Sequence, residues 1–184
     1  MKVKILVPVI FLVALLGLAS FPLCAEEVSH YAGMEVEKGR EFFKNGDFDA
    51  ALGRFNQAII LDPGYAPAYY GSAQVYGARN QMSQAIHYFR KTIELADPPM
   101  VDAYVNLGIA LMVTGKEDES FQMFQKALEI DPDNRNVHAN LAQYYCSQLN
   151  GAKAWAHIKI AQRLGLKVNE EQLTDMESIC PEGR

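Results

Sequence analysis

The sequence has few of the residues that bind metals or nucleotides. Its 184 residues include three cysteines and four histidines, and none of them forms a CxxC or HExxH motif. The one Gly-Lys pair, Gly115-Lys116, is followed by two acidic residues and lacks the glycine-rich loop that binds phosphates. We therefore predict no cofactor, no metal site and no nucleotide site.

The sequence also lacks a recognisable set of catalytic residues. Cys146 follows His138 by eight residues, and eight residues of helix rise about 12 Å, so the two side chains cannot share a proton directly. Acidic pairs such as Asp131 and Asp133 lie at predicted helix ends, where carboxylates typically stabilise the helix. We predict that the protein is not an enzyme.

Positive charge is in the minority. The sequence has 17 lysines and arginines against 22 aspartates and glutamates, which gives a net charge of −5. Removal of an N-terminal leader with two lysines and no carboxylate changes the net charge to −7. A nucleic-acid partner is not expected, because polyanions attract basic surfaces.

Residues 1–25 have the pattern of a secretory signal peptide. Lys2 and Lys4 precede an apolar run over residues 5–18, which is short for a membrane span. Pro22 then interrupts the run shortly before Ala25. We expect cleavage after Ala25, a short lead-in at residues 26–31, and a protein that is exported to the periplasm or secreted.

Two alternatives to cleavage after Ala25 remain open. Lipidation at Cys24 would anchor the protein to a membrane, although Pro22 and Leu23 occupy positions where such a signal has small residues. An uncleaved signal would also hold the chain at the membrane. No other membrane contact is expected.

Small and aromatic residues recur at constant spacing along the rest of the chain. Seven residues of one segment have counterparts 69 positions later, which corresponds to two periods of 34 to 35 residues. The pairs are Gly39 and Gly108, Phe42 and Leu111, Gly46 and Gly115, Ala51 and Ser120, Phe55 and Phe124, Ala58 and Ala127, and Pro63 and Pro132.

This pattern resembles the tetratricopeptide repeat, a helix-turn-helix unit of about 34 residues. The resemblance covers residues 32–166 and implies an all-α fold, an α-solenoid of about four stacked helix pairs. The copies span about 32–65, 66–100, 101–134 and 135–166. Residues 167–184 are expected to form a capping helix and a tail, with Asn169 as N-cap and Gln172 three residues later, and this helix should close the open end of the core.

The resemblance implies that certain small residues are buried where helices pack closely. The three sets are Gly39, Ala73, Gly108 and Ala142; Ala51, Ala85, Ser120 and Ala154; and Ala58, Thr92, Ala127 and Ala161. The space that remains is expected to be filled by Phe42, Tyr76, Leu111 and Tyr145.

The sequence also predicts the turn between the two helices of each copy. Gly46, Asn80 and Gly115 stand at the same turn position and accept the left-handed backbone that such turns need. The fourth copy is less regular, with Leu149-Asn150-Gly151 at its turn.

In the tetratricopeptide repeat family, the first helices of the copies line a concave face that binds partners. The resemblance places a peptide-binding groove at Arg40, Phe43, Lys44, Tyr70, Gln74, Asn106, Ile109, Met112, Asn140 and Gln143. Asn106 and Asn140 stand one copy apart, and their amides can bond the backbone of an extended peptide. They can equally well face water, and the apolar members can equally well pack between helices.

One binding mode of the family, a clamp for the C-terminal carboxylates of chaperones, needs basic and asparagine side chains at set positions. Here Val36, Gly71 and Asp102 stand where that clamp has Lys, Asn and Lys. Arg40, Lys44 and Asn106 are present at other clamp positions. Chaperone-type specificity is therefore not expected.

Cys146 and Cys180 would remain after cleavage, in a compartment where disulfides persist. The resemblance places Cys180 on a fifth first helix, at the position that Cys146 has on the fourth. Neighbouring helices lie about 8–10 Å apart and a disulfide needs about 4.4–6.8 Å between α-carbons. The two cysteines can form a disulfide only if their helices lean together.

The resemblance implies a scaffold that binds a protein or peptide partner in its groove. For an exported chain, the partner would be a segment of another exported or envelope protein, in secretion, pilus or envelope assembly. The alternative is a structural or oligomeric envelope component that uses its convex face or its terminal helix. Fold does not determine function, and the sequence identifies neither the partner nor the oligomeric state.

Overall fold

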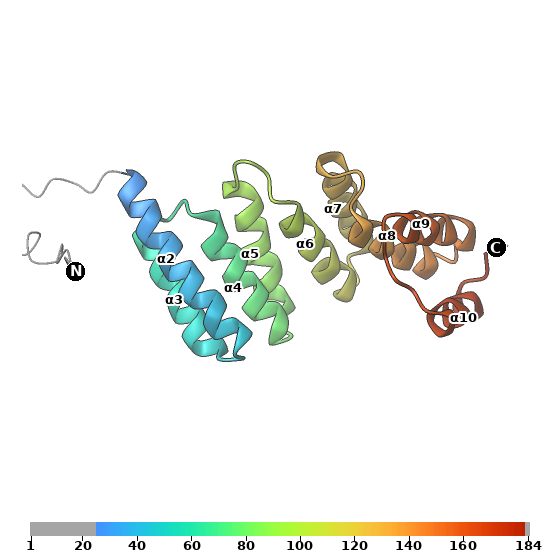
Figure 1. The fold of residues 1–184 in the computed structure, drawn as a ribbon, viewed down its shortest axis with the longest axis horizontal. Helices are drawn as coiled ribbons and strands as arrows, with labels where there is room; N and C mark the ends of the chain where they lie inside the picture. Colours follow the sequence, from blue (N-terminus) through green and yellow to red (C-terminus); the bar gives the residue numbers. More distant parts are fainter. Residues whose placement is uncertain (1–24, 183–184) are drawn as a thin grey trace, which may run out of the picture.

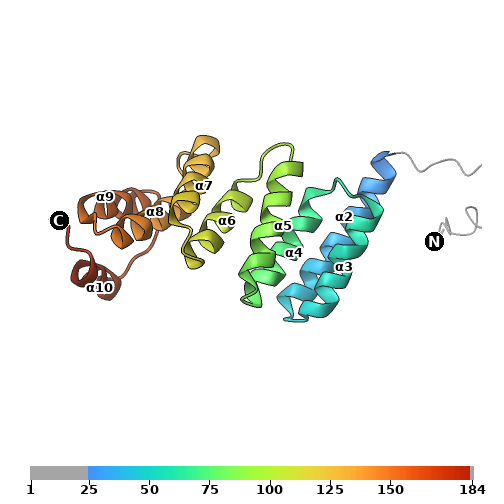
Figure 2. The same cartoon turned by 180° about the vertical axis from the view of Figure 1, so that it is seen from behind.

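A computed structural model describes residues 25–182, which form a row of α-helices without strands. Residues 1–24 of the predicted signal peptide, Cys24 included, lie outside the described residues. Figures 1 and 2 show the helices as antiparallel pairs that stack from one end of the molecule to the other. The helices are α2 (Ala25–Lys44), α3 (Phe48–Leu61), α4 (Ala66–Ala78), α5 (Met82–Leu95), α6 (Val101–Val113), α7 (Glu117–Ile130), α8 (Arg135–Ser147), α9 (Gly151–Arg163) and α10 (Glu170–Ile179).

Consecutive helices pair within each copy, and each pair contacts the next. The pairs are α2 with α3, α4 with α5, α6 with α7, and α8 with α9. Contacts between α3 and α4, α5 and α6, and α7 and α8 join neighbouring pairs. This arrangement confirms the predicted all-α solenoid of four helix pairs. Helix α2 includes the first described residue, Ala25, so the lead-in at residues 26–31 is helical rather than a separate segment.

The small residues that recur with the period are buried, as predicted. All twelve positions, from Gly39 to Ala161, belong to the buried class. Phe55, which is 1% exposed, shows why residues at some of these positions must be small. A Cβ atom would lie 2.6 Å from the Phe55 ring at Gly39 and 2.4 Å from it at Gly71. One aromatic ring therefore occupies the space that two glycines leave open in neighbouring copies.

The four residues predicted to fill the remaining space do so to different degrees, and Phe42 and Tyr76 pack against the buried core. Leu111 is buried, but Phe42, Tyr76 and Tyr145 are only half-buried. Phe42 and Tyr145 lie beneath the cationic groups of Arg54 and Lys153, at 6.0 and 5.0 Å from the ring centres, and Tyr76 stacks on Tyr88 at 5.1 Å. Each second helix also contributes a large buried side chain at an equivalent position, namely Phe55, Phe89, Phe124 and Ile158.

The turns follow the predicted pattern and extend it to the fourth copy. Gly46, Asn80 and Gly115 have φ angles of +78°, +58° and +75°, and Leu149 has +56°. Left-handed backbone disfavours a side chain with a Cβ atom, and leucine cannot form the local hydrogen bonds by which asparagine side chains can offset this cost. Leu149 is also 79% exposed, so its side chain contributes little packing.

We expect Leu149→Gly to stabilise the protein by about 1 kcal/mol, because it relieves the left-handed strain without removing a buried contact. Urea unfolding followed by far-UV circular dichroism measures the change. Leu149→Ala keeps the strain and serves as the matched control. Equal midpoints for the two variants would contradict the expectation.

The predicted C-terminal helix is present but covers the end of the solenoid only in part. Asn169 and Gln172 form the expected capping box at the start of α10. No residue of α10 itself is buried, and Ile179 is 70% exposed. The segment after α10 is held more firmly, because Cys180 is buried and its carbonyl accepts a hydrogen bond from Trp155 Nε1 at 2.9 Å.

Candidate peptide-binding groove

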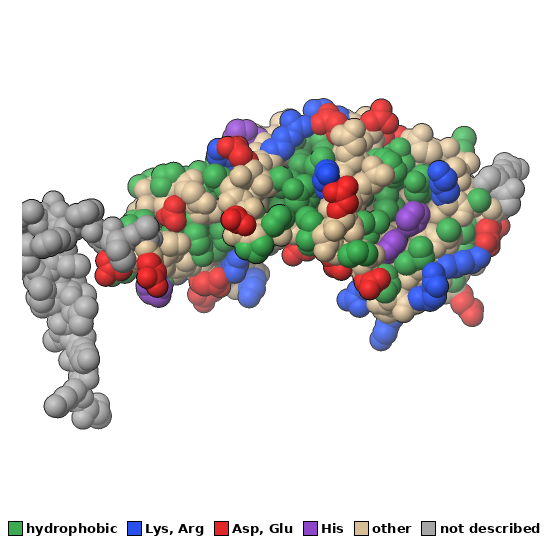
Figure 3. Space-filling view, turned by 90° about the horizontal axis from the view of Figure 1, so that it is seen from above, with side chains coloured by type: hydrophobic (Ala, Val, Ile, Leu, Met, Phe, Trp, Pro, Cys, Tyr) green, Lys and Arg blue, Asp and Glu red, His purple; other side chains and the backbone are tan. Residues whose placement is uncertain are grey.

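The first helices of the four pairs lie next to one another and line one face of the solenoid. Helix α2 contacts α4, and α6 contacts α8. Between these, the amide of Asn106 on α6 donates a hydrogen bond to the hydroxyl of Tyr70 on α4 at 2.9 Å. Seen from above in Figure 3, patches of hydrophobic side chains lie between scattered charged groups along the molecule.

An apolar groove cavity of about 290 Å³ lies among α2, α4, α5 and α6. The sequence predicts four of its lining residues, namely Phe43, Gln74, Asn106 and Ile109. The others come from the ends of α4 and from α5 and α6, and they are Gly77, Ala78, Met82, Ala85, Phe89 and Ala110. The cavity can therefore take an apolar side chain, with the amides of Gln74 and Asn106 available for polar contacts.

A polar groove cavity of about 480 Å³ continues along α4, α6 and α8. Asn106 and Ile109 line both cavities, so the two form one trough. The polar groove cavity is lined by Tyr70, Asp102, Val105, Asn106, Ile109, Asn136, Ala139 and Asn140. It contains three asparagine amides and one carboxylate, a set that suits hydrogen bonds to a peptide backbone.

Asn106 and Asn140 are each bound to the protein through one amide hydrogen. Asn106 donates to Tyr70, and Asn140 donates to the carbonyl of Asn136 on its own helix at 2.9 Å. Within residues 25–182 neither amide oxygen accepts a hydrogen bond. Each side chain is thus held in place while its oxygen can accept from a ligand.

Tyr70 shapes the centre of the trough. Its ring packs against Phe89 with the ring centres 5.8 Å apart. Burial, and next the charge of Asp102, raises the pKa of the Tyr70 hydroxyl to about 12. The hydroxyl therefore stays protonated at neutral pH, where it accepts from Asn106 and keeps its own hydrogen for a ligand.

The remaining predicted groove residues lie around this trough. Arg40 is exposed and donates to Glu37 at 2.6 Å, one turn away on α2. Lys44 is exposed at the end of α2, and Met112 is half-buried on α6. Gln143 lines a third cavity, at the C-terminal end. Val36, at a groove position of the family, is 1% exposed and belongs to the core.

Sequence reasoning misses several residues of the trough. Asn136 is one, although it precedes Asn140 by one helical turn and this spacing could have indicated it. Met82 and Phe89 are others, because they lie on a second helix and the resemblance nominates only first helices.

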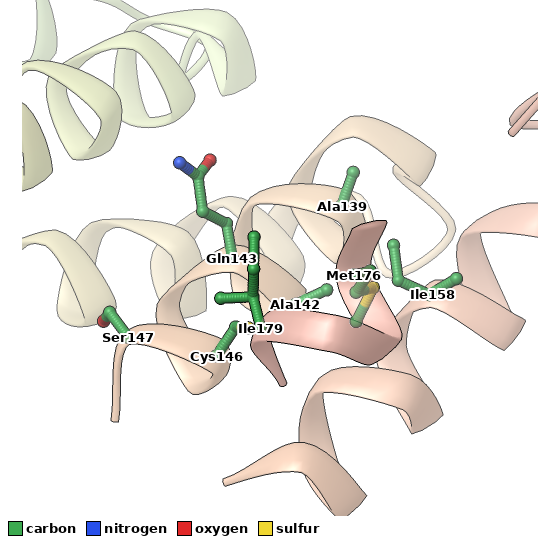
Figure 4. Close-up of a pocket in the computed structure, with 8 residues that line it drawn as sticks. All are labelled: Ala139, Ala142, Gln143, Cys146, Ser147, Ile158, Met176 and Ile179. Atoms are coloured by element: carbon green, nitrogen blue, oxygen red, sulfur yellow. The ribbon is translucent and has the colours of Figure 1, made fainter. Parts of the chain in front are cut away.

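The C-terminal cavity, of about 450 Å³, lies between α8, α9 and α10 (Figure 4). Its lining residues are Ala139, Ala142, Gln143, Cys146, Ser147, Ile158, Met176 and Ile179. Cys146 lines the cavity and contacts the buried Cys180; both are free thiols in this structure, and the disulfide between them stays a prediction. Burial, together with a hydrogen bond to Cys180, raises the pKa of the Cys146 thiol to about 11. Among residues 25–182 no cluster of side chains could hold a metal ion.

A pair of histidines joins α8 to α9 next to this end. Nδ1 of His138 lies 2.9 Å from Nδ1 of His157, and Nε2 of His138 lies 3.1 Å from the carbonyl oxygen of Pro132. Since a carbonyl only accepts, His138 carries its proton on Nε2, and His157 donates to it. Burial, then the nearby His138, then Lys153 lower the pKa of His157 below its usual 6.5.

We expect the free energy of unfolding to fall as the pH decreases below about 6.5, because the unfolded chain then binds a proton that folded His157 resists. His157→Gln should reduce this slope between pH 7.5 and 5.5 in urea unfolding. His87→Gln, on the exposed side of α5, leaves the pair intact and should keep the parent slope. Identical slopes for the two variants would rule out His157 as the source.

Comparisons with known proteins agree with the stacked helix pairs of the fold. Two models of the tetratricopeptide repeat match the chain, one over residues 36–97 and one over residues 101–134, which is just over half of its length. The chain belongs to the tetratricopeptide repeat family. Members of this family serve as scaffolds for protein–protein interaction, and the stacked helix pairs here are tetratricopeptide repeats. None of the helices within residues 25–182 is both long and apolar enough to cross a membrane.

Individual relatives share the repeats but differ in length. The Hsp70-Hsp90 organizing protein 2 of Arabidopsis thaliana is 32% identical over 103 residues, which is 56% of this chain and 18% of that protein. The chain thus spans about a fifth of the length of this curated relative. A crystal structure of MamA matches 78% of this chain and 81% of that chain with a TM-score of 0.66 and 20% identity. A structure of YrrB, a tetratricopeptide repeat protein with an unusual peptide-binding site, matches 71% of this chain and 67% of that chain with a TM-score of 0.62 and 18% identity.

Proposed function

We propose that the protein is a non-catalytic scaffold that holds an extended peptide segment of another protein in the trough formed by the two groove cavities. The observation that carries this proposal is the continuity of the trough across α4, α6 and α8, with Asn106 in its centre. An extended peptide offers one donor and one acceptor per residue, which side-chain amides match. The peptide-binding site named for YrrB supports the same use of this fold.

We further propose that the protein is exported and that its partner is an exported or envelope protein, in secretion, pilus or envelope assembly. The support is the sequence alone, with Lys2 and Lys4 ahead of the apolar run and Ala25 at the expected cleavage point. Mass spectrometry of the mature N-terminus tests this. Glu26 as the first residue agrees with cleavage, a lipid on Cys24 supports the anchored alternative, and an intact leader contradicts export by cleavage.

The groove is tested by Asn106→Ala combined with Asn140→Ala. We expect partner affinity to fall about tenfold, because each neutral hydrogen bond contributes about 0.5–1.5 kcal/mol. Proximity labelling from the exported protein identifies the partner, and a quantitative pull-down measures the loss. Circular dichroism checks that the fold is intact.

Asn56→Ala provides the control for the groove variant. Asn56 is exposed on α3, a second helix, so its loss should leave binding unchanged. Partners retained at parental levels by the double groove variant would refute the groove. Capture of further copies of the same chain, unaffected by the double variant, would favour the structural alternative.

A further inference from the structure

The C-terminal cavity has an apolar lining that remains open to solvent. Ala142 and Ile158 form its base, and Met176 and Ile179 contribute its outer wall from α10 (Figure 4). Ile179 is 70% exposed although it lines an apolar cavity. Because burial of apolar surface is favourable, a ligand that covers these side chains would gain affinity.

This cavity continues the trough rather than standing apart from it. Ala139 lines both the C-terminal cavity and the polar groove cavity. Asn140 belongs to one cavity and Gln143 to the other, and they are three residues apart on α8. A chain bonded to the asparagines could therefore place its next large side chain between α8 and α10.

The charges around this end favour a basic segment. Helix α10 carries four carboxylates, Glu170, Glu171, Asp175 and Glu177, and no basic residue. Asp102 lines the polar groove cavity, and no lysine or arginine lines either cavity.

The basic residues of α9 are partly engaged by the protein itself. Lys159 forms an ion pair with Glu182, and Lys153 lies over the Tyr145 ring. Lysine or arginine in a ligand would thus meet carboxylates of α10 that form no ion pair within residues 25–182, and these carboxylates attract it.

We propose that the C-terminal cavity is an anchor subsite of the groove, which takes one bulky apolar side chain of a partner segment whose neighbouring residues are lysine or arginine. The proposal rests on the proposed function, because the same segment must lie in the trough. The apolar side chain supplies affinity through its burial. The flanking positive charges select the segment and speed its association.

A random dodecapeptide library displayed on phage tests the subsite without knowledge of the natural partner. The library is panned against the mature chain and, separately, against a double variant, Met176→Gln with Ile179→Asn. This α10 wall variant makes the outer wall of the cavity polar without a new charge. Thr174→Asn is the matched control, because Thr174 is exposed on the same helix and lines no part of this cavity. The double groove variant with alanine at Asn106 and Asn140 is panned in parallel.

We expect enriched peptides to carry leucine, phenylalanine or tryptophan next to lysine or arginine. A synthetic copy should bind the α10 wall variant about tenfold more weakly than the parent, given the burial energy of one large side chain. It should bind Thr174→Asn as it binds the parent. Exchange of its basic residues for glutamate should also weaken binding.

Two results would overturn the subsite. In the first, the enriched peptides lack this composition. In the second, they bind the α10 wall variant as tightly as the parent. In both, the double groove variant binds the peptides weakly. In either case the groove stands and the anchor is refuted. If no peptide is enriched, or if the double groove variant binds the peptides as the parent does, the proposed function is refuted. The subsite is then refuted too, because it rests on that function.

Discussion

Replacement of Phe55 by alanine should destabilise the protein by about 3–5 kcal/mol. The ring is 1% exposed and fills the space between the backbone at Gly39 and Gly71, so it joins the first copy to the second. Neither glycine has a side chain that could move into the vacated volume. The variant therefore loses both the burial of the ring and the packing around it.

Urea unfolding followed by circular dichroism measures the loss at Phe55. Ile60→Ala is the matched control, since it truncates an apolar side chain of the same helix that is 72% exposed. The control should stay within about 0.5 kcal/mol of the parent. If Phe55→Ala unfolded at the same urea concentration as the control, the ring would not be the element that joins the copies.

Gly108→Ala should destabilise the protein by about 1–3 kcal/mol, although alanine is the better helix former. The added Cβ atom would lie 2.6 Å from Cε1 of Phe124, whose side chain is fully buried and cannot retreat. The gain in helix propensity is therefore smaller than the cost of overpacking. Helices α6 and α7 would have to separate to accept the methyl group.

Gly53→Ala is the control, because it measures the effect of the same substitution on stability at a site without close packing. Gly53 lies within α3, and a Cβ atom there would have no neighbour within 4 Å. The same substitution should stabilise the protein by up to about 1 kcal/mol. Thermal unfolding measures both variants: Gly108→Ala should lower the unfolding temperature and Gly53→Ala should raise it. If both variants shift it in the same direction, close packing at Gly108 does not limit side-chain size.

The sequence predicts the fold well because each repeated small residue has a local reason. Ala58 and its equivalents are buried wherever two helices approach, and this requirement appears in the sequence once per period. The left-handed turn at Gly46 is equally local. Such features depend on residues close in sequence, so periodicity is enough to find them.

The site is harder to predict because it depends on how copies stand relative to one another. The contact between Tyr70 and Asn106 joins residues 36 positions apart, and its existence depends on the rotation between neighbouring pairs. The role of Met82 in the trough has the same origin. Helix α10 follows an irregular copy, so no repeated pattern states how closely it packs on α8. The proposed groove residues, the disulfide and the localisation remain predictions for experiment.

The way α10 is attached has a consequence for recognition. A helix without buried residues can separate from its neighbours at a small free energy of local opening, far below that of global unfolding. Its backbone amides should therefore exchange with deuterium much faster than those of α6, whose apolar residues are deeply buried. The solenoid thus joins a rigid central trough to an adjustable outer wall. Backbone hydrogen bonding at the centre would set the register of a bound segment, while the end of the groove could adapt to side chains of different size.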